Sequence, residues 1–307
     1  MYESTLGKAL FLSVFPLPTI MKKLWTLCAA LLSTVSLASA QSAASCCAKP
    51  AGQNATEAFA MLATNEDFSG GHDAPLPYTY AGEGQGIEFK TPDGQTGKGF
   101  EIKSATPSDK YLFVIHEWWG LNDYIKQEAA KFAKDLPGVN VIALDLYDGK
   151  VATTADEASK LMQAVKTDRA QAIIKGGLQY AGPKAQVASI GWCFGGGWSL
   201  QTALLAGPQA KASVMYYGMP EKDAAKLKTL NTDVLFVFAK QDQWINQKVV
   251  DQFQKDMATA KKGLTVKTYD ADHAFANPSN PKYNKAFGDD AHAASVAYLK
   301  KNLKLKS

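Results

Sequence analysis

A cysteine stands between two glycines at the point where an apolar strand is expected to end. Residues 186–190 read Gln-Val-Ala-Ser-Ile, and Gly191-Trp-Cys-Phe-Gly195 follows them. This Gly-x-Cys-x-Gly pattern is typical of a nucleophile elbow, a tight strand-to-helix turn that presents the nucleophile at its tip. Glycine suits both flanking positions because the backbone there passes too close to its neighbours to leave room for a Cβ atom. The alternative is a buried structural cysteine, and residues further along the chain favour a nucleophile at Cys193.

An acid and a histidine follow this cysteine in the chain order that an elbow nucleophile requires. The apolar stretch 234–239 predicts a strand, and Asp242 comes just after it. A second predicted strand, 265–269, is followed by His273. An aspartate in a loop is more often a turn former and a lone histidine is more often structural. Three such residues in this order are harder to explain by chance, so we predict a triad in which Asp242 orients His273 and His273 serves as the base for Cys193.

A further loop completes the expected site. The predicted strand 111–115 runs into His116-Glu117-Trp118-Trp119-Gly120. By position, the backbone N–H groups of Trp118 and Phe194 are expected to form the oxyanion hole. A cysteine nucleophile suits activated acyl groups such as enol esters, lactones and thioesters, because their leaving groups need little protonation.

The sequence resembles the dienelactone hydrolase family over roughly residues 84–303. The resemblance rests on segments at Glu117–Asn122, Asp145–Tyr147, Gly191–Gly196, Tyr216–Gly218, Asp242 and His273–Ala276. It implies an α/β-hydrolase fold and hydrolysis of a small ester or lactone through an acyl-enzyme, without a cofactor. It also implies the Cys193–His273–Asp242 triad, with Glu117 holding the resting thiol and helping to deprotonate it.

Two departures from the family concern the substrate. The family is expected to grip a substrate carboxylate with two arginines, one of them four residues after the histidine, where this chain has Asn277. The stretch 153–157, which corresponds to the other, has no basic residue, and Arg169, the only arginine, is expected on a helix surface. Asparagine cannot supply the bidentate fork of arginine, so a neutral substrate is expected.

Several side chains have open assignments. We expect Trp119, Tyr216 and Asn277 to line the substrate site, although tryptophans 118 and 119 could equally be packing anchors. Of Tyr216 and Tyr217, one should face the cleft and the other the core. His116 should point to the opposite face from Glu117, Lys150 could reach the cleft mouth or be solvated, and surface positions are expected for His72 and His292.

The chain of 307 residues has a formal charge of +4 and 46% hydrophobic residues, enough for a sizeable core. It has no basic run that would indicate nucleic-acid binding. Residues 21–40 combine a basic start, an apolar run and an Ala-Ser-Ala cleavage signal, which predicts a signal peptide and export, to the periplasm in a diderm bacterium. Residues 1–20 are interpreted as an upstream extension. The apolar run is too short for a membrane span.

Export would leave Cys46, Cys47 and Cys193, an odd number of thiols, with Cys193 the unpaired one. The adjacent cysteines could form a strained disulfide, pair between chains or carry lipid, within a segment interpreted as a flexible tether. No metal site is expected, because no histidine stands near that pair.

The rest of the chain predicts one domain after a leader. Residues 1–40 are assigned to the extension and signal peptide, 41–83 to a leader or tether with a possible helix at 55–64, and 84–307 to the α/β domain. A hairpin is expected at 86–103, followed by alternating strands and helices. Strands are expected at 111–115, 139–145, 186–190, 212–217, 234–239 and 265–269, and helices at 123–135, 155–182, 196–206, 247–261 and 284–302. This alternation predicts a mostly parallel sheet with helices on both faces.

Two functional hypotheses remain at this stage. The first is a secreted hydrolase of small esters or lactones with a Cys-His-Asp triad. The second is a periplasmic binding or thiol-redox protein that keeps the elbow but has no turnover, as the odd thiol count allows. The complete set of Glu117, Cys193, Asp242 and His273 favours the hydrolase, because a binding protein has no need of that order.

Overall fold

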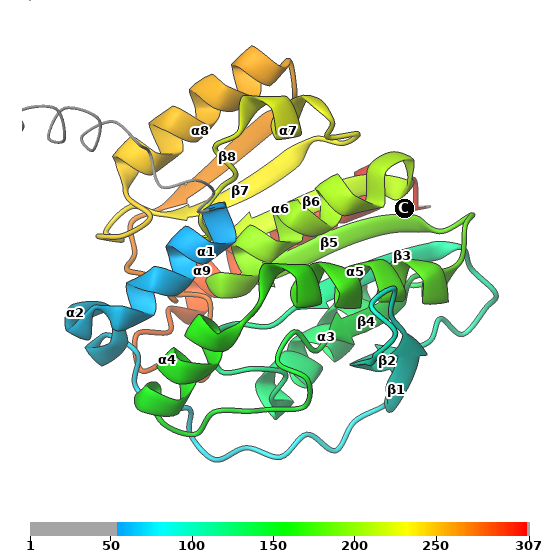
Figure 1. Cartoon of the computed structure of the whole chain (residues 1–307), viewed down its shortest axis with the longest axis horizontal. Coiled ribbons are helices and arrows are strands. Elements are labelled where there is room, and N and C mark those ends of the chain that lie inside the picture. The colour runs from blue at the N-terminus through cyan, green and yellow to red at the C-terminus, as the bar shows by residue number, and fades with distance from the viewer. Residues whose placement is uncertain (1–53, 306–307) are drawn as a thin grey trace, which may run out of the picture. The chain divides into compact units, whose positions relative to one another are not determined.

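An eight-stranded sheet forms the centre of the computed structural model, which describes residues 54–305 (Figure 1). Its strands lie in the order β1-β2-β4-β3-β5-β6-β7-β8, and all neighbours from β4 to β8 are parallel. The parallel strands are β3 (Lys110–Ile115), β4 (Asn140–Leu144), β5 (Gln186–Trp192), β6 (Ala210–Tyr216), β7 (Val234–Ala239) and β8 (Leu264–Tyr269). Their near-continuous apolar sequences suit strands covered on both faces.

A hairpin extends the sheet at one edge, as predicted. Strand β1 (Gln85–Lys90) pairs antiparallel with β2 (Thr96–Ile102), and β2 continues antiparallel onto β4. The turn between β1 and β2 contains Gly94 at φ 79°, a conformation that favours glycine.

Helices cover both faces of the sheet, with α5 and α6 on one side and α3 and α9 on the other (Figure 1). The longer helices are α3 (Asp123–Asp135), α4 (Ala155–Ala164), α5 (Thr167–Ala181), α6 (Phe194–Ala206), α8 (Gln247–Ala260) and α9 (Lys285–Asn302). Shorter elements are η2 (Gly207–Gln209) and α7 (Ala224–Lys228). Asparagine side chains cap the first turns of α3, α8 and α9, which is why these helices begin where the sequence predicts.

The helix predicted at 155–182 is in fact two helices, because the backbone is extended at Val165 and Lys166. Residues outside these two helices stabilise the break between them. The Thr167 hydroxyl donates to Glu57 and accepts from the Asn54 amide, so the start of α5 is tied to the N-terminal part of the described chain.

Residues 54–72, which we call the N-terminal strap, pack onto the domain. The strap contains α1 (Ala55–Ala60), η1 (Met61–Thr64) and α2 (Glu66–Gly70). Phe59 and Phe68 are only 2% and 1% exposed, and Ser159 of α4 donates to the Ala63 carbonyl. The helix predicted at 55–64 is present, as α1 followed by η1. The prediction of a leader or tether is wrong for residues 54–72, because the strap buries two aromatic rings and belongs to the same compact unit as the domain.

The predicted signal peptide, Met21–Ala40, and the Cys46-Cys47 pair lie outside the described residues. Within residues 54–305, no helix has both the length and the apolar character needed to cross a bilayer.

Packing of the strap can be tested by truncating Phe68. Phe68→Ala should lower the free energy of unfolding by about 3–5 kcal/mol, the usual cost of emptying a buried phenylalanine site. Met61→Ala is a matched control, because Met61 lies in the same strap and is 49% exposed. Urea unfolding of both variants gives the comparison, and equal small effects would contradict the packing described here.

Candidate active site

Cys193 lies at the turn between β5 and α6, in a conformation rarely seen for a side-chain-bearing residue. Its φ is 55° and its ψ is −118°. Such backbone strain costs of order 1–3 kcal/mol and persists only where the surroundings enforce it. The predicted elbow is therefore present, with the cysteine at its tip.

Two glycines enforce that turn by close approach. A Cβ atom on Gly191 would overlap the backbone of Gly195, and one on Gly195 would overlap the carbonyls of Ile115 and His116. The end of β3 thus presses directly against the start of α6. Any larger residue at either position would displace the nucleophile.

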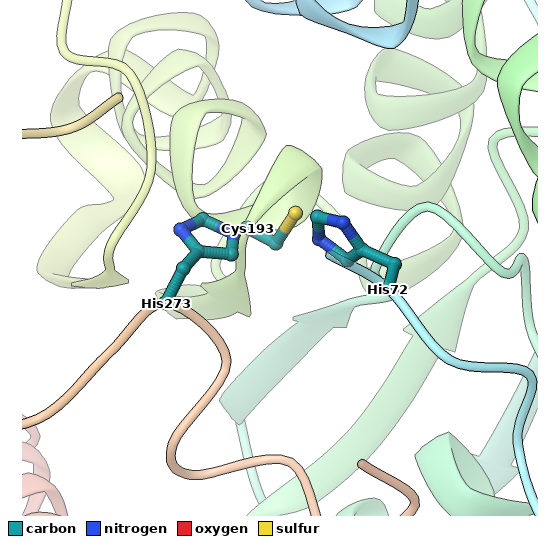
Figure 2. A group of neighbouring side chains, drawn as sticks. All are labelled: His72, Cys193 and His273. Carbon is teal, nitrogen blue, oxygen red and sulfur yellow. The ribbon is translucent and has the colours of Figure 1, made fainter. Parts of the chain in front are cut away.

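His273 and Asp242 come together as expected, each in the loop after a strand. Nδ1 of His273 lies 2.6 Å from Oδ2 of Asp242. The other carboxylate oxygen accepts from the N–H groups of Trp244 and Ile245, at 2.8 and 3.0 Å, so the aspartate is held in place. Because a carboxylate only accepts, Nδ1 carries the proton and Nε2 presents a lone pair. That nitrogen lies within 4.8 Å of the Cys193 sulfur (Figure 2).

Burial dominates the electrostatics of the nucleophile. Cys193 has no exposed surface, and desolvation raises the pKa of its thiol, while His273 and the Phe194 N–H act in the opposite direction. Burial by itself would lower the pKa of His273, but the Asp242 carboxylate outweighs it and raises that pKa. The pKa of Asp242 is in turn lowered, because the charge and hydrogen bond of His273 exceed the effect of burial. Burial therefore makes the thiol harder to ionise, while Asp242 and Cys193 make the imidazole of His273 more basic.

Glu117 follows β3 and is 5% exposed. Burial raises the pKa of its carboxyl to about 7, against the opposing influence of His273 and of Asn277. The Asn277 amide donates to Oε2 of Glu117 at 2.6 Å, and its own carbonyl oxygen accepts from the N–H and hydroxyl of Ser279. Near neutral pH this glutamate can therefore hold or release a proton.

The two expected oxyanion donors differ in their present contacts. Within residues 54–305, the N–H of Trp118 donates to no backbone carbonyl. The N–H of Phe194 is hydrogen-bonded to the Cys193 sulfur.

A narrow cavity lies beside Glu117, with room for about one water molecule. Trp119 and Asn277 are on its wall, together with Tyr124, Glu128 and Trp192. Trp118 is fully buried and packs instead against Trp119 and the strap.

Tyr216 does not face the site, contrary to our expectation. Its hydroxyl bonds to Ser295 of α9 at 2.7 Å, on the far side of the strand. Tyr217 has the cleft position, with its ring 4.9 Å from that of His273. One tyrosine faces the site and the other faces the core, as predicted, but the residue at the site is Tyr217 and not Tyr216.

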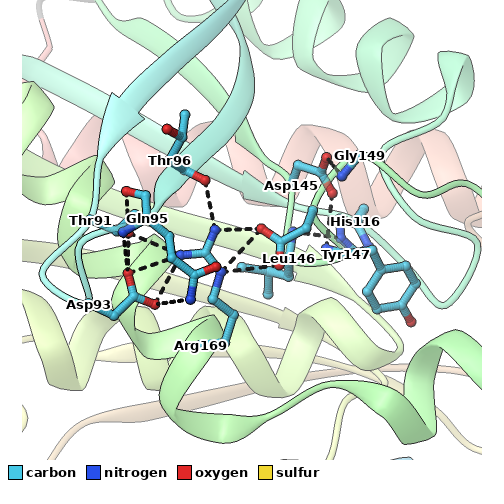
Figure 3. Close-up of polar contacts among 11 residues, drawn as sticks. Thr91, Asp93, Gln95, Thr96, His116, Asp145, Leu146, Tyr147, Gly149 and Arg169 are labelled. Atoms are coloured by element: carbon cyan, nitrogen blue, oxygen red, sulfur yellow. Dashed lines mark hydrogen bonds and ion pairs between the residues drawn. The ribbon is translucent and has the colours of Figure 1, made fainter.

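His116 has a structural role. Its Nδ1 donates to the Glu117 carbonyl. Its Nε2 accepts from the N–H of Leu146 at 3.1 Å (Figure 3). Both ring nitrogens are therefore used to join the end of β3 to the loop after β4.

Arg169 cannot serve as a substrate anchor where it stands. Its guanidinium bonds to Asp148, Asp93 and the Thr96 carbonyl, and only 14% of its side chain is exposed (Figure 3). Lys150 is exposed and lines a separate hollow beside Arg169, away from the cavity at Glu117.

The sequence did not reveal the position of His72, which was expected on the surface. It is 6% exposed, and its ring lies 4.3 Å from that of Trp118 and 5.4 Å from that of His273. The only feature of the sequence that could have indicated this burial was the spacing of apolar residues in the strap, because His72 lies at the end of the strap and beside the site. His292 is also not a free surface residue, because it is partly buried and bonds to Asp135.

The parallel sheet, the cysteine elbow, and the acid and histidine after β7 and β8 define an α/β hydrolase. The model of the dienelactone hydrolase family matches residues 98–303, and the chain belongs to that family of hydrolases.

Individual relatives agree with this assignment. The chain is 29% identical over 238 residues to protein usf of Aquifex pyrophilus, covering 72% of this chain and 99% of that one. It is 24% identical over 233 residues to a carboxymethylenebutenolidase of a Pseudomonas species (strain P51), covering 71% and 95%. In fold it is similar to a dienelactone hydrolase-like promiscuous phosphotriesterase from metagenomic libraries, with a TM-score of 0.60, 22% identity, and coverage of 72% and 99%.

The burial of Glu117 predicts a pH-dependent cost in stability. Because its pKa is raised in the folded state, stability should fall as pH increases from about 4.5 to about 7, by on the order of 3 kcal/mol. Glu117→Gln removes the charge and can still accept from Asn277. This variant should therefore be more stable than the natural protein at pH 8, with most of the gain absent at pH 5.

Urea unfolding at the two pH values measures this difference. Glu88→Gln is the control, because Glu88 is exposed on β1. A gain that is equal at both pH values would show that charge burial is not its cause.

Proposed function

We propose that the protein hydrolyses small neutral esters or lactones through a Cys193 acyl-enzyme. The observation that carries this proposal is the 2.6 Å contact between His273 and Asp242, with the free nitrogen of His273 turned toward the elbow thiol. This arrangement supplies a nucleophile, a base and an orienting carboxylate in one place.

The reaction would proceed in two halves. In the first, His273 Nε2 takes the thiol proton while the sulfur attacks the acyl carbon, and the N–H groups of Trp118 and Phe194 receive the oxyanion. The intermediate then expels the alkoxide or enolate, which takes the proton from the imidazolium. In the second half, His273 deprotonates a water molecule, which attacks the thioester and releases the acid and the free thiol.

Glu117 supports deprotonation of the thiol in this scheme. A pKa of about 7 lets it exchange a proton near neutral pH. Asn277 has a positioning role, because its amide bonds directly to the Glu117 carboxyl. This contact would explain why an asparagine stands at a position where the family is expected to have an arginine.

Three features support a neutral substrate. Asn277 cannot form a charged pair with a carboxylate, and Arg169 is already bonded to two aspartates. Two acidic side chains, of Glu117 and Glu128, also line the cavity, and neither can form an ion pair with a substrate carboxylate. The aromatic rings of Trp119, Tyr124 and Trp192 offer an apolar surface for an acyl or alcohol group.

We also propose that the protein is exported. The support is the signal-like sequence at Met21–Ala40, outside the described residues. Mass spectrometry of the mature chain, with an N-terminus at Gln41, would test this.

The triad can be tested by burst kinetics with a p-nitrophenyl ester. Cys193→Ala should abolish turnover, and Asp242→Asn should lower kcat by about 10⁴-fold because it stabilises the wrong imidazole tautomer. Combining Asp242→Asn with His273→Ala should cost little more than either change alone, since the residues act as a unit. His292→Gln is the control and should retain activity.

A double variant that shows the product of the single losses would contradict the triad. If natural protein gives neither burst nor turnover, while its thiol cycles with a disulfide reductant, the thiol-redox hypothesis would replace hydrolysis.

Substrate charge is tested by comparing a neutral ester with an analogue that carries a carboxylate and the same leaving group. The neutral ester should have a kcat/KM about 30-fold higher or more, because a carboxylate without a buried cationic partner loses at least about 2 kcal/mol. A preference for the carboxylated compound, at the same pH and ionic strength, would overturn this prediction.

A further inference from the structure

Three buried side chains with metal-ligating atoms meet at the elbow. His72 comes from the strap, Cys193 from the turn after β5, and His273 from the loop after β8 (Figure 2). One ligand atom of each lies within 4.8 Å of the other two. The hydrolytic scheme uses Cys193 and His273 and gives no role to His72.

The ring of His72 has a fixed orientation with one unused nitrogen. Its Nδ1 lies 2.6 Å from the Phe68 carbonyl, which can only accept, so Nδ1 carries the proton. Its Nε2 is then an acceptor, and this atom is buried without a hydrogen-bond partner among the described residues. With the proton on Nδ1, the Nε2 atom of the neutral ring presents its lone pair.

Both histidines have the outer contacts that metal-bound histidines usually have. A ligating imidazole almost always donates its other N–H to a carboxylate or a backbone carbonyl. His273 donates to Asp242, and His72 donates to the Phe68 carbonyl. In each ring Nε2 is the nitrogen left without a hydrogen-bond partner among the described residues, and both Nε2 atoms are buried.

We propose that His72, Cys193 and His273 form a binding site for Zn²⁺. Two imidazoles and a thiolate are a favourable donor set for this ion, and a fourth position would be left for water. Zinc–sulfur and zinc–nitrogen distances of about 2.3 and 2.0–2.1 Å separate tetrahedral ligands by roughly 3.3–3.6 Å. The three atoms therefore need to close by on the order of 1 Å.

Charge and protons balance in the zinc form. The two charges of Zn²⁺ are matched by the Cys193 thiolate and the Asp242 carboxylate, so the ion, its three ligands and Asp242 together carry no net charge. The sulfur–hydrogen bond is replaced by a zinc–sulfur bond, and the thiol proton is released to solvent.

The consequence for activity rests on the proposed function. Zinc would occupy the nucleophile and the lone pair of the base at the same time, which makes it a reversible inhibitor that a chelator removes. His72 would be the residue that makes this inhibition tight, because a Cys193–His273 pair alone offers only two ligands.

The test uses untagged full-length protein in which Cys28, Cys46 and Cys47 are serine, so that Cys193 is the only thiol. Co²⁺ replaces zinc as a spectroscopic probe, and Zn²⁺ affinity is measured by competition with a chromophoric chelator. We expect a thiolate-to-cobalt charge-transfer band together with the visible bands of tetrahedral Co²⁺. We also expect one bound zinc and one released proton per chain.

The variant His72→Gln keeps an amide donor for the Phe68 carbonyl but lacks the imidazole lone pair. Zinc affinity should fall at least about 100-fold, since loss of an outer-shell partner alone costs 10–100-fold. His292→Gln, at a partly buried histidine on α9, should leave the affinity unchanged. Unfolding curves of both variants show whether the fold is retained, and His72→Ala provides a second substitution.

The outcomes separate this site from the hydrolytic proposal. Absence of the charge-transfer band, or equal zinc affinity in natural and His72→Gln proteins, would overturn the zinc site even if ester hydrolysis is found. A His72-dependent zinc site in a protein that hydrolyses no ester would leave the zinc site standing and reject the catalytic scheme.

Discussion

The close approach of three backbone segments at the elbow is the constraint on which the site depends. The turn at Gly191 and Gly195 leaves no space for side chains, and it places the end of β3 against the start of α6. This contact forces Cys193 to a positive φ and fixes the loop that carries Glu117 and Trp118 relative to the thiol. Because the neighbouring strands are parallel, the loops after β7 and β8 open at the same sheet edge and bring in the acid and the histidine.

Two carboxyl groups lie in this small buried region, and each is stabilised by different hydrogen-bond partners. Asp242 is held by two backbone N–H groups and by His273, whereas among residues 54–305 the Glu117 carboxyl accepts only from the amide of Asn277. The first carboxyl therefore stays ionised, while the second has a pKa of about 7. Two acidic groups close to one imidazole thus acquire different protonation states from their surroundings alone.

Local patterns in the sequence were sufficient for the sheet, the elbow and the order of the triad residues. Apolar runs and asparagine caps are local signals, so strands such as β7 and helices such as α3 were predicted nearly to the residue. The helix at 55–64 was predicted, but the packing of the strap and the burial of His72 were missed because they depend on distant contacts, namely Phe68 against Trp118 and Trp244. The choice between Tyr216 and Tyr217 likewise depended on Ser295, 79 residues away in the chain.

The strap also bears on the chemical durability of the nucleophile. Oxidation of cysteine to sulfenic and higher acids follows solvent exposure and thiolate character. With no exposed surface and a raised pKa, the Cys193 thiol has neither. Peroxide and an ester must both reach this buried sulfur, so resistance to oxidants and speed of turnover both depend on how often it becomes accessible. A sequence change that loosens the contact of Phe68 would favour turnover and shorten the working life of the protein in an oxidising environment.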